Sequence, residues 1–191
     1  MIHEVIVTSR SAKGEPQIAP MGVVWQGGEV VIAPFHPSRT LDNILSGGCA
    51  VINYCDDVRI FAGCLTGRHD WPMIEAGHVA APRLLDALAH TEIRLLRVEE
   101  DRIRPRLICH PVHEASHRPF RGFNRAQAAV LELAILVSRL ERLPAEKIER
   151  ELAYLAIAVD KTAGEREQEA WAWLTARVAD FQGRRAREEV L

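Results

Sequence analysis

The sequence has few of the features that mark several common classes of protein. Aromatic residues make up only 6% of the 191 positions, and the net charge is −2. Nucleic acids require a concentrated basic surface, which this balance does not favour. No apolar run is long enough to cross a bilayer, and no basic segment followed by an apolar core opens the chain. We therefore expect no nucleic-acid partner, no membrane span and no signal peptide.

Several motifs of nucleotide and acyl-transfer chemistry are also missing. The chain contains no P-loop, no G-x-G-x-x-G segment and no G-x-S-x-G nucleophile elbow. Its four cysteines form no C-x-x-C pair, and a chain of this size can bury a core without disulfides. We expect reduced, mostly buried thiols in a cytoplasmic protein. If the protein binds a nucleotide, we expect a binding motif other than a Rossmann fold or a P-loop.

The densest set of structural signals lies in residues 17–53. Two β-rich runs flank Gly27-Gly28, which favours a tight hairpin because both central residues of a primed turn need φ > 0. A short helical pattern then follows Thr40, and Gly47-Gly48 ends it before another apolar run, Cys49–Asn53. The order strand, strand, short helix, strand is thus expected here.

A run of two hydroxyls and an arginine stands between the second strand and the helix. Ser38, Arg39 and Thr40 occupy the place where helix amides have no partner and the helix dipole is positive. Such a turn suits a phosphate. Ser38 or Thr40 could equally be only an N-cap, the commonest role of a hydroxyl at a helix start, and Arg39 could be only solvated.

The middle of the chain reads mostly as strands and loops. Ile2–Ser9 predicts a well-covered strand, and the runs Thr91–Val98 and Arg102–Val112 predict two long strands with one wet, basic face. Asp56-Asp57 lies between the first of these strands and the other two, and the pair is typical of a helix cap rather than of a catalytic pair. Residues 67–82 predict a loop with a helical turn, and Leu84–Leu88 predicts a short amphipathic segment.

From Asn124 onward the hydrophobic period changes to 3.6 residues, which predicts three amphipathic helices with short connections. The chain is therefore divided into residues 1–122 and residues 123–191, and the fold class is α+β. The apolar stripes are no wider than a helical core needs, so a structural role is expected for the tail; a partner-binding module is the alternative.

Three histidines beside a cysteine form a possible metal site. His110, His113 and His117 follow Cys109 at spacings that can share zinc or iron. The alternative is a polar strand end with exposed histidines, because H-x-x-H lacks the helical i, i+4 register of a zincin. The second interpretation is preferred, and no metal is expected.

Six short motifs resemble, in the same order, an uncharacterised family of FMN-binding split-barrel proteins related to the flavin reductases. These motifs are Glu4–Ser9, Ile18–Val23, Pro34-Phe35, Ser38-x-Thr40-x-x-Asn43, Val51-x-Asn53 and Gly122–Ala126. The resemblance runs over nearly the whole chain. It implies a six-stranded, mainly antiparallel split β-barrel over residues 1–122, a helical subdomain over residues 123–191, and a homodimer with FMN near its interface.

The resemblance also assigns cofactor-binding residues. It places the phosphate by Ser38, Arg39 and Thr40, with Asn43 close. The strand run around Gly22 is positioned to meet the flavin ring, where glycine allows close approach; simple strand packing is the alternative for Gly22, and core filling for Met21. The predicted set consists of Pro20, Met21, Gly22, Val23, Ser38, Arg39, Thr40, Asn43, Asn53, Asn124 and Arg125; the resemblance allows the last two to come from the partner chain.

Two functions follow from this resemblance. The first is an FMN-dependent oxidoreductase that passes electrons from NAD(P)H to an unknown acceptor, with the flavin carrying the redox chemistry. The second is a non-catalytic flavin-binding or pathway-accessory protein. No residue matches an obvious proton donor, so no catalytic residue is assigned.

Overall fold

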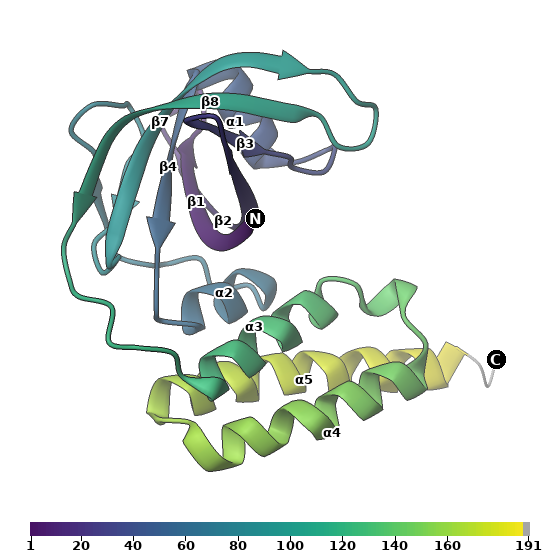
Figure 1. Cartoon of the computed structure of the whole chain (residues 1–191). Coiled ribbons are helices and arrows are strands. Elements are labelled where there is room, and N and C mark those ends of the chain that lie inside the picture. Colours follow the sequence, from purple (N-terminus) through teal and green to yellow (C-terminus); the bar gives the residue numbers. More distant parts are fainter. Residues whose placement is uncertain (189–191) are drawn as a thin grey trace. The chain divides into compact units, whose positions relative to one another are not determined.

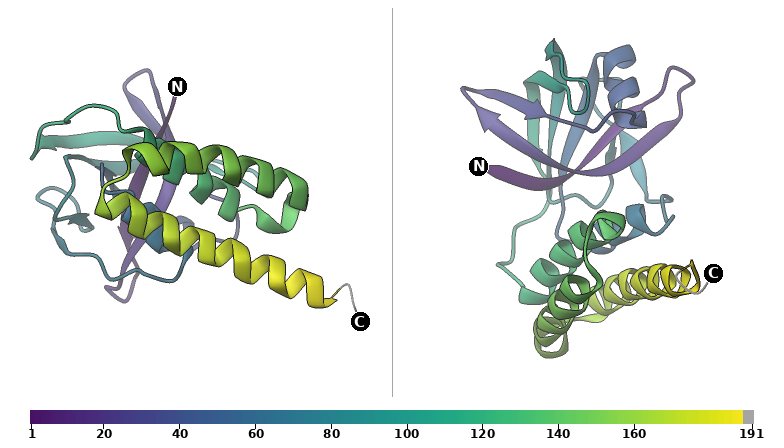
Figure 2. Two further views of the ribbon diagram at one scale, coloured as in Figure 1. Left: turned by 90° about the horizontal axis from the view of Figure 1, so that it is seen from below. Right: turned by 90° about the vertical axis from the view of Figure 1, so that its right-hand side faces the viewer.

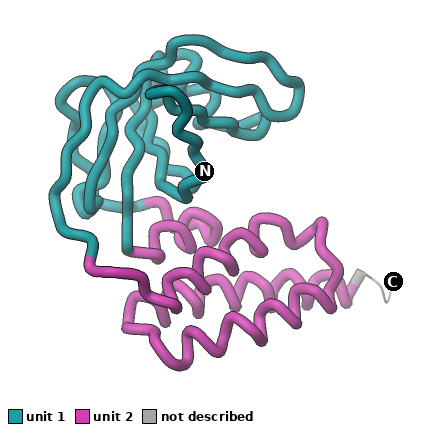
Figure 3. The backbone as a smooth tube through the Cα atoms, viewed as in Figure 1, with its two compact units in different colours: residues 1–56, 70–120 teal, residues 57–69, 121–191 magenta. Residues whose placement is uncertain are grey.

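The chain forms two compact units, shown in different colours in Figure 3. The computed structural model describes residues 1–188, with the side chains of residues 1–187. Unit 1 comprises residues 1–56 and 70–120, and unit 2 comprises residues 57–69 together with the chain from residue 121 on. The expected division at residue 122 assigns residues 57–69 to the first part of the chain, whereas in the structure this segment packs with the C-terminal helices. None of the helices in the described part of the chain is long and apolar enough to cross a membrane.

Unit 1 is a barrel of antiparallel strands in the order β1-β2-β3-β8-β7-β4 (Figure 1). Its strands are β1 (Ile2–Arg10), β2 (Pro16–Gln26), β3 (Glu29–Ile32), β4 (Cys49–Tyr54), β7 (Ala89–Glu99) and β8 (Arg106–Ser116). β1 also pairs with β4 over three residues, which closes the barrel. The six-stranded antiparallel barrel confirms the predicted fold class.

Apolar side chains that alternate along the strands fill the interior of the barrel. Val5 and Val7 of β1 and Ile52 of β4 are fully or almost fully buried, and they pack in one cluster with residues of every other barrel strand. Helix α1 (Arg39–Gly47) adds Leu41 and Ile44 to the same cluster. At about 25 cal/mol per Å² of apolar surface, burial of this kind is the main term that holds the barrel together.

The glycine signals in the first third of the chain are confirmed. Gly27 and Gly28, between β2 and β3, have φ of 59° and 81°, as a primed turn requires. Gly48 ends α1 with φ of 67°, and its amide donates to the carbonyl of Ile44. These turns fix the position of α1 between β3 and β4.

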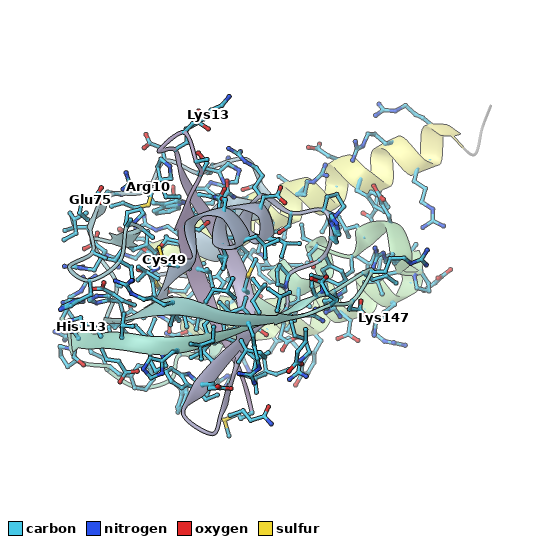
Figure 4. The ribbon with its side chains drawn as sticks, turned by 90° about the horizontal axis from the view of Figure 1, so that it is seen from above. Arg10, Lys13, Cys49, Glu75, His113 and Lys147 are labelled. Carbon is cyan, nitrogen blue, oxygen red and sulfur yellow. The ribbon has the colours of Figure 1, made fainter. Side chains whose placement is uncertain are left out.

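The region between β4 and β8 differs from the prediction. Residues 67–88 contain no helical turn or amphipathic helix; instead β5 (Met73–Glu75) and β6 (Pro82–Leu84) form a separate two-stranded sheet. Arg10 of β1 bonds to Glu75 of β5, and both lie side by side in Figure 4. These segments are held by tertiary contacts rather than by a local periodicity, which is why the sequence does not reveal them.

The two long strands also differ in their limits. β8 begins at Arg106 rather than Arg102, and it continues through Ser116, so His110 and His113 lie within the strand instead of at its end. Ile103, which falls within the predicted strand, is exposed and lies in the connection between β7 and β8. Bulges between Glu92 and Ile93 and between Leu95 and Arg97 shift the pairing and change which side chains share a face.

Unit 2 is built from helices, three of them predicted from the 3.6-residue period. The helical elements of unit 2 are α2 (Arg59–Leu65), α3 (Arg125–Val137), a short 3₁₀ turn (Leu140–Arg142), α4 (Ala145–Thr162) and α5 (Glu165–Glu188). The three predicted from the period are α3, α4 and α5. Their apolar faces meet in one core that includes Val130, Leu133, Ile148 and Leu174. α4 and α5 meet at the loop that joins them and diverge from there (Figure 2).

The N-cap of α2 is Val58, not one of the two aspartates as predicted, but Asp57 supports the start of the helix from the preceding position. Its carboxylate accepts the amide of Arg59 at 3.1 Å and pairs with the Arg59 guanidinium at 2.7 Å. Arg59 in turn contacts Glu169 of α5 at 3.0 Å. The segment 57–69 is therefore attached to the C-terminal helices by charge as well as by its apolar face.

Candidate functional site

The turn before α1 is built around the cap residue Ser38. The backbone of Ser38 is extended, and its Oγ accepts the amide of Leu41 at 3.0 Å. The N-cap alternative for Ser38 is therefore realised. The same hydroxyl keeps its hydrogen for donation, because a serine oxygen can accept and donate at once. Capping and anion binding are thus compatible at this residue.

Arg39 is the first residue of α1 and projects into solvent. Its side chain is 70% exposed, and its only charged partner recorded in the described part of the chain is Glu15, at 3.8 Å. An exposed pair of this kind contributes little to stability. The guanidinium is therefore accessible to an anion that approaches the N-terminus of the helix, where the dipole favours negative charge.

Thr40 and Asn43 face the interior instead. Thr40 is 2% exposed, and Asn43 is 7% exposed with its Nδ2 donating to Ser9 Oγ at 3.1 Å. Asn43 thus attaches α1 to β1. Of the four predicted phosphate residues, two are available at the surface and two hold the turn in place.

The run Pro20–Val23 lies in the middle of β2, paired with β1. Met21 and Val23 point into the barrel and pack with its core. Gly22 lies on the opposite face, where an added Cβ would come within 2.8 Å of Ile2 Cγ2. Ile2 is itself 65% exposed. The side chains of Ile2 and Glu4, both exposed, therefore lie over the backbone at Gly22. Met21 packs against the core, as its alternative interpretation proposed.

Asn53 is fully buried on β4, and both the nitrogen and the oxygen of its side-chain amide make hydrogen bonds within the protein. Its Nδ2 lies 3.1 Å from the carbonyl of Ile6, 3.0 Å from Thr8 Oγ1 and 3.3 Å from the carbonyl of Val51. Its Oδ1 accepts the amide of Leu84 at 2.7 Å. These bonds join β1, β4 and β6 where the barrel closes, a structural role that sequence reasoning did not assign.

Asn124 and Arg125 belong to unit 2. Asn124 caps α3, since its Oδ1 accepts the amides of Ala126 and Gln127 at 2.8 and 3.2 Å. Its Nδ2 donates to the carbonyl of Thr162 at 3.1 Å, which ties the start of α3 to the end of α4. Arg125 is exposed. A cofactor role for either residue stays a prediction.

The candidate metal set of Cys109, His110, His113 and His117 does not come together as a unit. Cys109 is buried in the barrel core and His110 is exposed, whereas His113 lies beside His78 and Glu92. Glu92 was missed because its place in the alternation assigns it to the wet face; the loop at residues 77–78 covers it, and it is 1% exposed. Burial raises the pKa of Cys109 to about 12, so this thiol is protonated and unreactive at neutral pH.

Two family models match the chain in succession. Residues 3–118 match the N-terminal domain of a protein of unknown function (DUF447), and residues 124–176 match its second model. The chain belongs to the DUF447 family. No curated protein sequence matches it significantly.

Solved structures of similar fold come from several organisms. An FMN-bound DUF447 protein from Methanosarcina mazei is 20% identical, with a TM-score of 0.79 over 92% of this chain and 94% of the other. A flavoredoxin from Methanosarcina acetivorans is 15% identical, with a TM-score of 0.52 over 61% of this chain and 69% of the other. An NADH:FAD oxidoreductase from Streptomyces globisporus is 13% identical, with a TM-score of 0.51 over 61% of this chain and 76% of the other. This DUF447 chain therefore has the split-barrel fold of FMN-binding proteins.

Proposed function

We propose that this DUF447 protein binds FMN and acts as an oxidoreductase of the flavin-reductase type with an unidentified electron acceptor. The observation that carries the proposal is the N-terminus of α1, where the cap hydroxyl of Ser38 is followed directly by the exposed guanidinium of Arg39. The match over 92% of the chain to an FMN-bound member of the same family supports it.

The residues present fit the chemical groups of FMN. Ser38, Arg39 and the first amides of α1 are donors for a dianionic phosphate. Because Gly22 has no Cβ, a flat ring could approach the strand closely once the exposed side chains of Ile2 and Glu4 move aside. Bound flavin would supply the electron transfer. Since the predicted set contains no carboxylate or imidazole, the role of these residues is to bind and orient the cofactor.

The proposed assembly is a homodimer with the flavin near the subunit boundary. What supports the dimer is the family resemblance, which draws Asn124 and Arg125 from the partner. Light scattering should give twice the monomer mass for the flavin-loaded protein, and a monomer mass at micromolar concentration would reject the dimer.

Absorption and steady-state kinetics test the function. After FMN is added and the excess removed, the protein should retain the visible absorption bands of a flavin and should oxidise NADH or NADPH. Flavin bands without nicotinamide oxidation would favour the non-catalytic, accessory function. A protein that retains no flavin at all would reject both.

Gly22→Ala separates close approach of the ring from strand packing. The added methyl group would lie 2.8 Å from Ile2 Cγ2 and 3.5 Å from Glu4 Oε1, so Ile2 must shift; because both side chains are exposed, the melting temperature should change little. If the ring rests on this backbone, FMN and riboflavin should both bind about tenfold or more weakly, which corresponds to about 1.4 kcal/mol. Fluorescence titration with both flavins measures this, and unchanged affinities would remove Gly22 from the site.

A further inference from the structure

A cluster of imidazoles surrounds one buried carboxylate on the outer face of β7 and β8. Glu92 of β7 is the cross-strand partner of His113 of β8, so the two side chains share a face. His90 lies two residues before Glu92 on that face. The fourth member, His78, comes from the loop between β5 and β6. Figure 4 shows His113 on the same side of unit 1 as Glu75 of β5.

The ligand-type atoms of three of these residues converge. One ring nitrogen of His78, one of His113 and a carboxylate oxygen of Glu92 all lie within 4.8 Å of one another. His78 Nδ1 is 3.4 Å from Glu92 Oε1. The rings of His78 and His113 are stacked, with centroids 4.2 Å apart and an angle of 24° between their planes.

Glu92 is held in one orientation by the loop that covers it. Its oxygens accept the amides of Gly77 and His78 at 3.0 and 2.6 Å. Burial favours a higher pKa for Glu92, but these hydrogen bonds outweigh burial and hold the pKa below its ordinary value. The nearest arginine of the strand, Arg94, donates to the carbonyl of His78 and so fixes the loop rather than neutralising the carboxylate.

His90 and His117 extend the cluster behind Glu92. His90 Nε2 is 3.4 Å from Glu92 Oε1, and its Nδ1 is 2.9 Å from His117 Nε2. Burial lowers the pKa of His90 and of His117, and the charge of Arg83 acts in the same direction. Two further imidazoles thus stand in a hydrogen-bonded chain behind the carboxylate.

We propose that His78, Glu92 and His113 bind a divalent transition-metal ion, with zinc as the preferred one. Two imidazoles and one carboxylate are a ligand set that zinc accepts, with a water in the fourth position. Metal–ligand distances of about 2.0–2.2 Å place ligand atoms closer together than 4.8 Å. The His78 side chain is 54% exposed, so its rotation can close this difference without disturbing the core.

His90 is a positioning residue for this site. Metal-bound side chains are commonly oriented by hydrogen bonds from residues behind them, and His90 and His117 form such a chain to the carboxylate. The proposal uses no residue of the predicted flavin site, so each of the two sites can fail without the other.

Titration of the full-length protein with zinc and cobalt tests the site. After chelator treatment and dialysis, calorimetry should detect one Zn²⁺ per chain, and Co²⁺ should give visible ligand-field bands. His78→Ala and His113→Ala should each weaken Zn²⁺ by about tenfold or more and abolish the Co²⁺ bands. His110→Ala is the matched control, because His110 is exposed on the same strand and should leave both signals unchanged.

Glu92→Gln removes the charge and keeps the size of the side chain. This variant should weaken Zn²⁺ binding at least as much as the histidine variants do. Circular dichroism shows whether the variant folds. If it does not, His78→Ala still decides, since its side chain is largely exposed. Zinc affinity and cobalt bands that persist in both histidine variants, or a wild-type protein that binds no metal, would overturn the proposal.

Discussion

Replacing Arg39 with alanine is expected to weaken FMN binding by about ten- to a hundredfold and to leave riboflavin binding almost unchanged. A charge-assisted hydrogen bond contributes about 1.5–3 kcal/mol net, and each 1.4 kcal/mol is about tenfold in affinity. Riboflavin lacks the phosphate and should not respond. The stability of the protein without cofactor should change little, because the pair between Arg39 and Glu15 is long and exposed.

Arg97→Ala provides the matched control for this experiment. Arg97 is also an exposed arginine that pairs with a glutamate, Glu29, at 2.9 Å, but it lies on β7 rather than at a helix start. Its removal should leave the ratio of FMN to riboflavin affinity unaltered. Equal FMN affinities in wild type and Arg39→Ala would exclude Arg39 from the phosphate site.

Ser38→Ala separates the two roles of the cap residue. Loss of the bond from Leu41 to Ser38 Oγ should lower the stability of the protein without cofactor by about 1 kcal/mol. If the hydroxyl also donates to the phosphate, the affinity for FMN should fall relative to the affinity for riboflavin. A stability loss with no change in that ratio would leave Ser38 as a cap alone.

Asn53→Ala is expected to lower the free energy of unfolding by about 3 kcal/mol, the largest stability change among these variants. The substitution leaves the buried amide of Leu84 without its acceptor and removes the donor shared by Ile6, Thr8 and Val51. An unsatisfied buried polar group costs about 1–3 kcal/mol, and several are affected here. Chemical denaturation with an unchanged m-value measures the effect.

Asn43→Ala is the comparison for Asn53. Asn43 is also a buried asparagine of unit 1, but it makes one side-chain bond, to Ser9. Its replacement should cost about 1 kcal/mol, the typical net contribution of one hydrogen bond. If both variants lose the same stability, the network around Asn53 is not what holds the closing strands together.

Local signals were sufficient for most of the fold. Gly27-Gly28 specified a hairpin because few residues adopt positive φ, and the change of period at Asn124 marked the helices because apolar residues recur every 3.6 positions. The start of α1 was predictable for the same reason, since a cap and a terminating glycine are encoded within ten or so residues. Ser38 and Arg39 could therefore be located before the structure was known.

The remaining features depend on contacts between distant segments. Nothing near Glu92 in the sequence shows that residues 77 and 78 will cover it and bury its carboxylate. The register between β7 and β8 decides that His113, rather than His110, lies opposite that carboxylate, and the alternation within each strand does not give the register between them. The role of Asn53 likewise depends on β6, which has no periodic signal of its own.

The position of α2 in the chain affects the order in which the protein can fold during synthesis. α2 leaves the ribosome between β4 and β5, but the residues that cover Val58 and Ala62 belong to helices made only after residue 124. All the barrel strands are complete by Ser116, so the barrel can close while α2 still exposes its apolar face. A chain that ends near residue 122 would form a barrel with an uncovered helix, and exposed apolar surface of this kind makes a species prone to aggregate.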